Sequence, residues 1–145
     1  MQLSRFVGAI CFGFLTVSTA YGLDAQGTWA GKVTCKHFDG DKGKSVYENF
    51  ILKITQTGTT IYADLDGGDY RYFGTAIPSI KDAEVGEIGI TLCQTGDSDA
   101  EVARLALKND RLKGESIYRW SGSNENCTWK FVRISTADPL VGPCP

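Results

Sequence analysis

Hydrophobic and polar residues alternate along most of this chain in short runs that turn residues separate. The run "NFILKIT" (49–55) puts Phe50, Leu52 and Ile54 on one face and polar residues on the other. The run "TIYADL" (60–65) repeats the pattern after "QTGT", a segment with a glycine. A period of two, with β-branched and aromatic residues between Gly and Asp turns, predicts β-strands joined by hairpins.

The same pattern predicts eight strands. We expect them at 27–37, 49–55, 60–65, 70–77, 87–93, 101–108, 112–120 and 127–134. The segment 101–108 has the composition of a helix former, but it is short, uncapped and flanked by strands, so we predict a strand there. Between the strands we expect one helical turn within 78–86 and a polar loop at 121–126. The proline-rich tail predicts an extended strap.

All the connections are short, whereas parallel strands need a crossover of a dozen or more residues. The strands are therefore predicted to be antiparallel neighbours in chain order. Eight such strands remove their free edges by closing into an up-and-down barrel. A β-sandwich is the alternative, and only the segment 78–86 could supply the longer return that it needs.

The first and last strands of a closed barrel pair with each other, and this sets a register. Position numbers of opposed residues in an antiparallel pair have a constant sum, which is 162 if Trp29 faces Arg133. Cys35 and Cys127 have the same sum, so they also lie opposite each other, close enough for a disulfide. Cys93 and Cys144 then pair by elimination, with the strap crossing the outside of the barrel.

The N-terminal 22 residues differ in character from the rest. A short segment with Arg5 precedes a twelve-residue apolar run and small residues, which is the layout of a secretory signal peptide. We expect cleavage after Ala20 or Gly22, leaving 23–145 as one domain that is secreted or periplasmic. The apolar run is too short to span a bilayer. Four cysteines in an exported domain predict two disulfides, and their scattered positions argue against zinc.

Charge narrows the range of partners. The whole chain has a formal net charge of −2, and loss of residues 1–22 removes Arg5 and no acid, which gives −3. A mildly acidic, mixed surface argues against nucleic acid or an anionic membrane as a partner, because both require a basic face. We expect a monomer without a membrane span.

The glycine and tryptophan of "GTW", together with a late arginine, resemble the lipocalin superfamily (calycins). In that family the arginine packs across the tryptophan and closes the bottom of the barrel. The resemblance rests on Gly27, Trp29, Arg133 and the architecture, and it implies a ligand site at the open mouth. Pro139 and Pro143 interrupt the segment where the family has a helix.

Candidate chemistry is sparse. His37 is the single histidine, no G-x-S-x-G motif occurs, and three acidic loops depart from the EF-hand pattern, so we expect neither an enzyme nor a metal site. Asn126 begins an N-x-T sequon.

An eight-stranded barrel holds either a packed core or one small ligand. The leading hypothesis is an exported protein that binds a small, partly apolar ligand, without a cofactor, at a mouth lined by Tyr72, Tyr118 and Trp129. The alternative is a protein-interaction or inhibitor module with a filled barrel, which would use the loops 37–45, 78–86 and 121–126. An enzyme is the third hypothesis.

Overall fold

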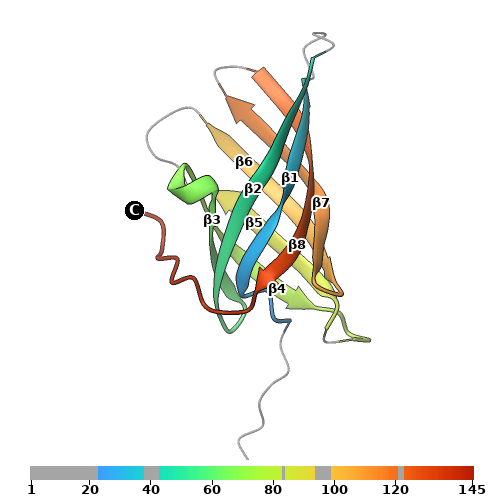
Figure 1. Ribbon diagram of the computed structural model, residues 1–145, viewed down its shortest axis with the longest axis vertical. Coiled ribbons are helices and arrows are strands. Elements are labelled where there is room, and N and C mark those ends of the chain that lie inside the picture. The colour runs from blue at the N-terminus through green and yellow to red at the C-terminus, as the bar shows by residue number, and fades with distance from the viewer. Residues whose placement is uncertain (1–22, 38–42, 83, 94–98, 121–122) are drawn as a thin grey trace, which may run out of the picture.

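Eight antiparallel strands form a closed barrel (Figure 1). The computed structural model describes residues 23–37, 43–82, 84–93, 99–120 and 123–145. Each strand pairs with its neighbours in the sequence, and β1 pairs with β8, so the predicted up-and-down topology is confirmed. The strands are β1 (Gly27–His37), β2 (Lys44–Thr57), β3 (Thr60–Leu65), β4 (Tyr70–Pro78), β5 (Gly86–Leu92), β6 (Ala100–Lys108), β7 (Arg111–Trp120) and β8 (Ser123–Ser135). A 3-10 turn, η1 (Asp66–Gly68), joins β3 to β4.

The seam between β1 and β8 has the predicted register. Trp29 lies opposite Arg133, and Cys35 lies opposite Cys127. Cys35 and Cys127 form a disulfide whose Cα atoms are 4.0 Å apart, and this bond links segments 92 residues apart. The covalent bond therefore fastens the two ends of the sheet to each other.

Large aliphatic side chains fill the end of the barrel where β1 starts. Odd-numbered strands begin at this end and even-numbered strands end there. Inward side chains of both odd and even strands meet at this end. Those with 0% exposure are Leu52, Ile54, Ile61, Ile88, Leu105 and Leu112. Burying one such side chain is worth about 1.5–3 kcal/mol. This half of the barrel has a solid core.

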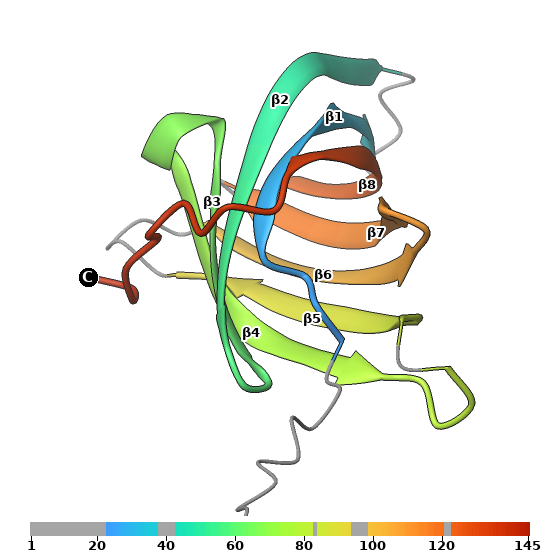
Figure 2. The same ribbon diagram turned by 60° about the horizontal axis from the view of Figure 1, so that its bottom comes forward.

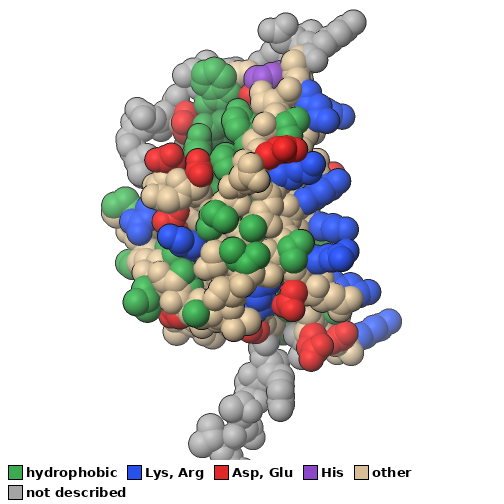
Figure 3. Space-filling view, viewed as in Figure 1, with side chains coloured by type: hydrophobic (Ala, Val, Ile, Leu, Met, Phe, Trp, Pro, Cys, Tyr) green, Lys and Arg blue, Asp and Glu red, His purple; other side chains and the backbone are tan. Residues whose placement is uncertain are grey.

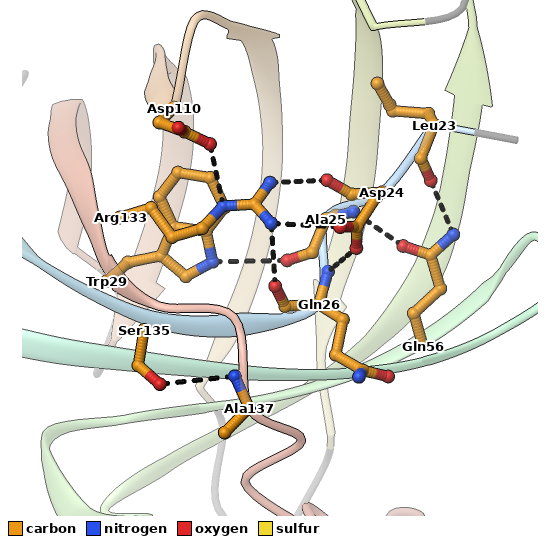
Figure 4. Close-up of polar contacts among 10 residues, drawn as sticks. All are labelled: Leu23, Asp24, Ala25, Gln26, Trp29, Gln56, Asp110, Arg133, Ser135 and Ala137. Carbon is orange, nitrogen blue, oxygen red and sulfur yellow. Dashed lines mark hydrogen bonds and ion pairs between the residues drawn. The ribbon is translucent and has the colours of Figure 1, made fainter.

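Arg133 closes the same end from β8 (Figure 4). Its guanidinium carbon lies 4.5 Å from the centroid of the Trp29 ring, and Trp29 itself is completely buried. The guanidinium donates to the backbone oxygens of Asp24 and Gln26 and forms an ion pair with the Asp24 carboxylate. Its Nε lies 3.0 Å from Asp110 Oδ1 in an ion pair without hydrogen-bond alignment. One arginine thus joins the tryptophan, the N-terminal segment and the β6–β7 turn.

Gly27 is required by this closure. Its φ is +131°, which side chains rarely permit, and a Cβ placed there would lie 2.1 Å from the Ser135 carbonyl oxygen. The glycine of the "GTW" motif therefore lets β1 approach the end of β8.

The C-terminal tail crosses the outside of the barrel, as predicted. It leaves β8 at the closed end and passes over β2 and β3 (Figure 2). The Thr55 hydroxyl on β2 donates to Asp138 and accepts from the Val141 amide. The second disulfide then joins Cys144 to Cys93, which follows β5. The pairing obtained by elimination is confirmed.

Two local predictions were wrong, and one strand is longer than predicted. The polar stretch 123–126 belongs to β8, because pairing with β7 extends to Ser123 and satisfies the backbone. The described residues between β4 and β5, 79–82 and 84–85, include bends and a turn and no helix. Strand β2 begins at Lys44, five residues before the alternating pattern starts, because it pairs with the far end of β1.

Three lysines form a row on the outer surface. Lys32 on β1 lies opposite Lys130 on β8, and Lys130 lies opposite Lys113 on β7. Figure 3 shows basic side chains gathered along this side of the barrel. Lys32 pairs with Glu48 at 3.6 Å, whereas the other two form no ion pair with any residue that the structure describes. The charge is therefore less evenly mixed than the composition predicted.

Candidate functional site

The open end of the barrel contains a cavity. The cavity is small, with a volume of about 60 Å³ in which the centre of a water molecule fits. Its hydrophobic lining consists of Val33, Leu65, Phe50 and Trp129 with the Cys35–Cys127 disulfide. Its polar and ionisable lining consists of Tyr47, Tyr70, Tyr72, Tyr118, Glu101 and Glu125. The barrel is thus filled at one end and has a small cavity at the other.

The three residues predicted to bind ligand all line this cavity. Tyr72 is 1% exposed and Trp129 is completely buried, whereas Tyr118 is half-buried nearer the rim. The Tyr72 ring meets the Trp129 ring edge to face, with centroids 5.8 Å apart. These rings form the floor and part of the wall of the cavity. Their role in binding stays a prediction.

A buried carboxylate, Glu101, lies at the centre of the polar lining. It is the second residue of β6 and only 5% exposed. The Tyr72 hydroxyl donates to one of its oxygens at 2.6 Å, and the Ser116 hydroxyl donates to the other. The Trp129 indole nitrogen donates to Ser116 at 2.9 Å, so the serine both donates and accepts. This network fixes the carboxylate in one orientation.

Burial governs the ionisation of this cluster. Burial raises the pKa of Glu101, the hydrogen bonds from Ser116 and Tyr72 partly offset the rise, and the Glu125 charge adds to it. Burial, together with the negative charge of Glu101, holds the pKa of Tyr72 well above its usual value. Tyr72 therefore remains a hydroxyl donor throughout the ordinary pH range.

A second buried carboxylate, Glu125, lies on β8 nearer the rim. It is 3% exposed, and one of its oxygens lies 2.8 Å from His37 Nδ1. The Trp120 indole nitrogen donates to the same oxygen at 3.4 Å. The single histidine of the chain thus lies beside a carboxylate at the mouth, where it forms an ion pair when the imidazole is protonated.

The rim carries one further acid and more aromatic rings. The Tyr118 hydroxyl donates to Asp99 at 3.2 Å. Burial, followed by the Asp99 charge, raises the pKa of Tyr118. The rings of Tyr70 and Tyr118 meet edge to face with centroids 6.5 Å apart, and those of Tyr47 and Phe50 stack at 5.6 Å. Aromatic faces and acids together dominate the entrance.

Sequence reasoning missed both buried glutamates, although a signal was present. Glu101 lies in register with the inward residues Ala103 and Leu105, and Glu125 lies in register with Cys127 and Trp129. Following the period of two one step further along each strand would have placed both carboxylates inside the barrel.

One cluster of metal-ligating atom types occurs among the described residues, formed by Cys35, Cys127 and Glu125 within 4.8 Å. The two sulfurs are bonded to each other, so they are not the thiolates that a soft metal ion requires. This cluster therefore does not form a metal site in the oxidised protein.

No protein-family model, curated protein or solved structure matches this chain. None of the helices in the described residues is long and apolar enough to cross a membrane. The two disulfides are compatible with an extracellular or periplasmic protein.

Proposed function

We propose that this protein binds a small, partly apolar ligand in the mouth of its barrel. The observation that carries the proposal is a cavity that combines aromatic walls with a few oriented polar groups at its base. Specific small-molecule sites have this composition, with hydrophobic lining for affinity and a small number of polar groups for orientation. The Tyr72–Glu101–Ser116 network supplies the polar groups here.

The size of the cavity limits the ligand. Space for water centres of about 60 Å³ corresponds to about four or five water molecules. The solid core around Trp29 prevents deeper entry. The bound portion of the ligand is therefore a group of a few heavy atoms, and a larger molecule would leave its remainder at the rim.

Export and a lipocalin-like relationship are part of the same proposal. The contact of Trp29 with Arg133 and the strained backbone of Gly27 support the resemblance at the closed end. The proposed signal peptide, residues 1–22, lies outside the described residues. Leu23, the first described residue, is 1% exposed, so the packed domain includes the chain from that point, close to the expected cleavage after Ala20 or Gly22.

A protein-interaction role is the second candidate. Ile77 and Ile80, at and after the end of β4, have exposures of 61% and 106%. Large exposed apolar patches mark contact surfaces, and these two side chains could contribute to one. This surface lies at the closed end of the barrel, so the two functions would use opposite ends.

Native mass spectrometry of protein purified from its own source tests ligand binding directly, because a retained ligand adds its mass. Titration with the neutral fluorophore N-phenyl-1-naphthylamine gives a second measurement. We expect Tyr118→Ala, at the rim, to weaken fluorophore binding. Tyr62→Ala is the matched control, because Tyr62 lies on β3 and does not line the cavity. Equal binding by both variants and the wild type would contradict a site at the mouth.

A further inference from the structure

The cavity at the mouth has an uneven distribution of charge. The lining residues that the structure describes include two glutamates and no lysine or arginine. Both glutamates are at least 95% buried. His37 contacts Glu125 from the rim, and no described basic side chain contacts Glu101.

Glu101 has satisfied hydrogen bonds and an uncompensated charge. The two side chains that donate to its oxygens, Tyr72 and Ser116, are neutral hydroxyls. Removing a carboxylate from water is costly unless a positive charge offsets the loss of hydration. A cation that enters the cavity would supply this compensation, because none of the described lining residues supplies it to Glu101.

The aromatic lining suits the same kind of ligand. The faces of aromatic rings attract cations, and Tyr and Trp residues around a cavity form the known cages for methylated ammonium groups. The closed end shows this chemistry within the chain itself, where Arg133 lies over Trp29. At the open end the described lining residues offer rings and two carboxylates, and no lysine or arginine among them lies between these groups.

We propose that the ligand of the barrel mouth is a small organic cation, an amine or quaternary ammonium compound, whose positive head lies between Glu101, Glu125 and the aromatic rings. This inference rests on the proposed binding function and specifies the ligand class. The apolar remainder of the ligand contacts Phe50 and Leu65 near the rim. A ligand that carries a carboxylate at its buried end is excluded, since it would be placed beside two acids of the same charge.

Three probes of similar size and different charge test the inference. Benzyltrimethylammonium is the cation, 2,2-dimethylpropylbenzene replaces its nitrogen with carbon, and benzenesulfonate is an anion. Binding to the full mature chain is measured by the quenching of tryptophan fluorescence and by calorimetry. We expect the cation to bind at least tenfold more tightly than the neutral isostere and the anion to bind more weakly than either.

Two variants locate the effect. Glu101→Gln keeps the shape of the side chain and removes the charge, so it should lose at least tenfold in cation affinity and keep its affinity for the neutral probe. Glu125→Gln should lower cation affinity in the same direction and serves if the first variant does not fold. Glu115→Gln is the control, because Glu115 is exposed on the outer face of β7. Its probe affinities should equal those of the wild type.

The outcomes separate the two proposals. Equal affinity for the cation and the neutral isostere, or a preference for the anion, would overturn the cation inference and leave ligand binding intact. Cation affinity that survives in Glu101→Gln and Glu125→Gln would also overturn it. Absence of binding by all three probes and by the neutral fluorophore, in protein that carries no retained ligand, would contradict both.

Discussion

Replacing Arg133 with alanine tests how the closed end of the barrel is stabilised. The side chain is 8% exposed, so water does not replace the contacts that it makes. The variant loses the contact with the Trp29 ring, worth about 1–2 kcal/mol at a desolvated site. It also loses charge-assisted hydrogen bonds to the backbone oxygens of Asp24 and Gln26, worth about 1.5–3 kcal/mol each before solvent recovers part of that value. We expect a net loss of about 3 kcal/mol.

The measurement is urea unfolding followed by tryptophan fluorescence, with thermal unfolding by circular dichroism. A loss of about 3 kcal/mol lowers the melting temperature by roughly 10 °C in a domain of this size. The dependence of stability on urea concentration should stay unchanged, because the barrel still unfolds as a whole. Arg133→Lys should recover part of the loss, since lysine keeps the charge but lacks the planar group that stacks on the ring.

Arg104→Ala is the matched control. Arg104 forms an ion pair with Glu87 on the outer face, where its side chain is 77% exposed. Exposed pairs contribute about 0–1 kcal/mol, so this variant should stay close to the wild type. If Arg133→Ala cost no more than Arg104→Ala, the account of the closed end would be wrong.

Three further predictions concern the row of lysines, the buried acid and the disulfides. Lys130→Glu places an acid between Lys32 and Lys113 and should stabilise the protein by about 0.5–1 kcal/mol in low salt and by less in 1 M salt, measured by urea unfolding. Because burial raises the pKa of Glu101 above 4.5, the folded wild type holds a proton that the unfolded chain releases, so its stability should fall as pH rises above 4.5. Glu101→Gln should lack this fall, and a constant difference between the two proteins across that pH range would refute it. Cys127→Ser should lower the free energy of unfolding more than Cys144→Ser. Loop closure implies about 4–5 kcal/mol for each disulfide, but of these two cysteines only Cys127 is fully buried, at 2% exposure, so its serine hydroxyl also lacks water. Equal losses in the free energy of unfolding would contradict this ranking.

The barrel was predictable because its strands carry a strong alternation and because two pairs of residues share one register. A shift of one position would turn Trp29 outward, which the hydrophobic pattern opposes, and would also move Cys35 away from Cys127. The hydrophobic pattern and the cysteines therefore each favour the same pairing of β1 with β8. The polar start of β8 was less predictable. Residues 123–126 have a loop composition, and only their hydrogen bonds to β7 make them a strand.

The lysine row shows what composition conceals. A net charge of −2 predicts a mixed surface, and it contains no information about which charges meet across strands. Lys32, Lys113 and Lys130 are far apart in the sequence and become neighbours only when the seam closes. Charge segregation on a barrel therefore depends on register, and an argument from net charge cannot exclude a basic face.

The two ends of the barrel differ in how aromatic rings and charges are combined. At the closed end the cation belongs to the chain, and Arg133 is neutralised by Asp24 and Asp110 around the Trp29 ring. That arrangement is complete, and it stabilises the fold. At the open end Glu101 and the rings have no lysine or arginine counterpart among the described lining residues, and a cavity lies beside them. Aromatic rings and carboxylates surround a cation of the chain at the closed end, whereas at the open end the rings and carboxylates surround a cavity. This difference between the two ends is the physical reason to expect a cationic ligand in the cavity.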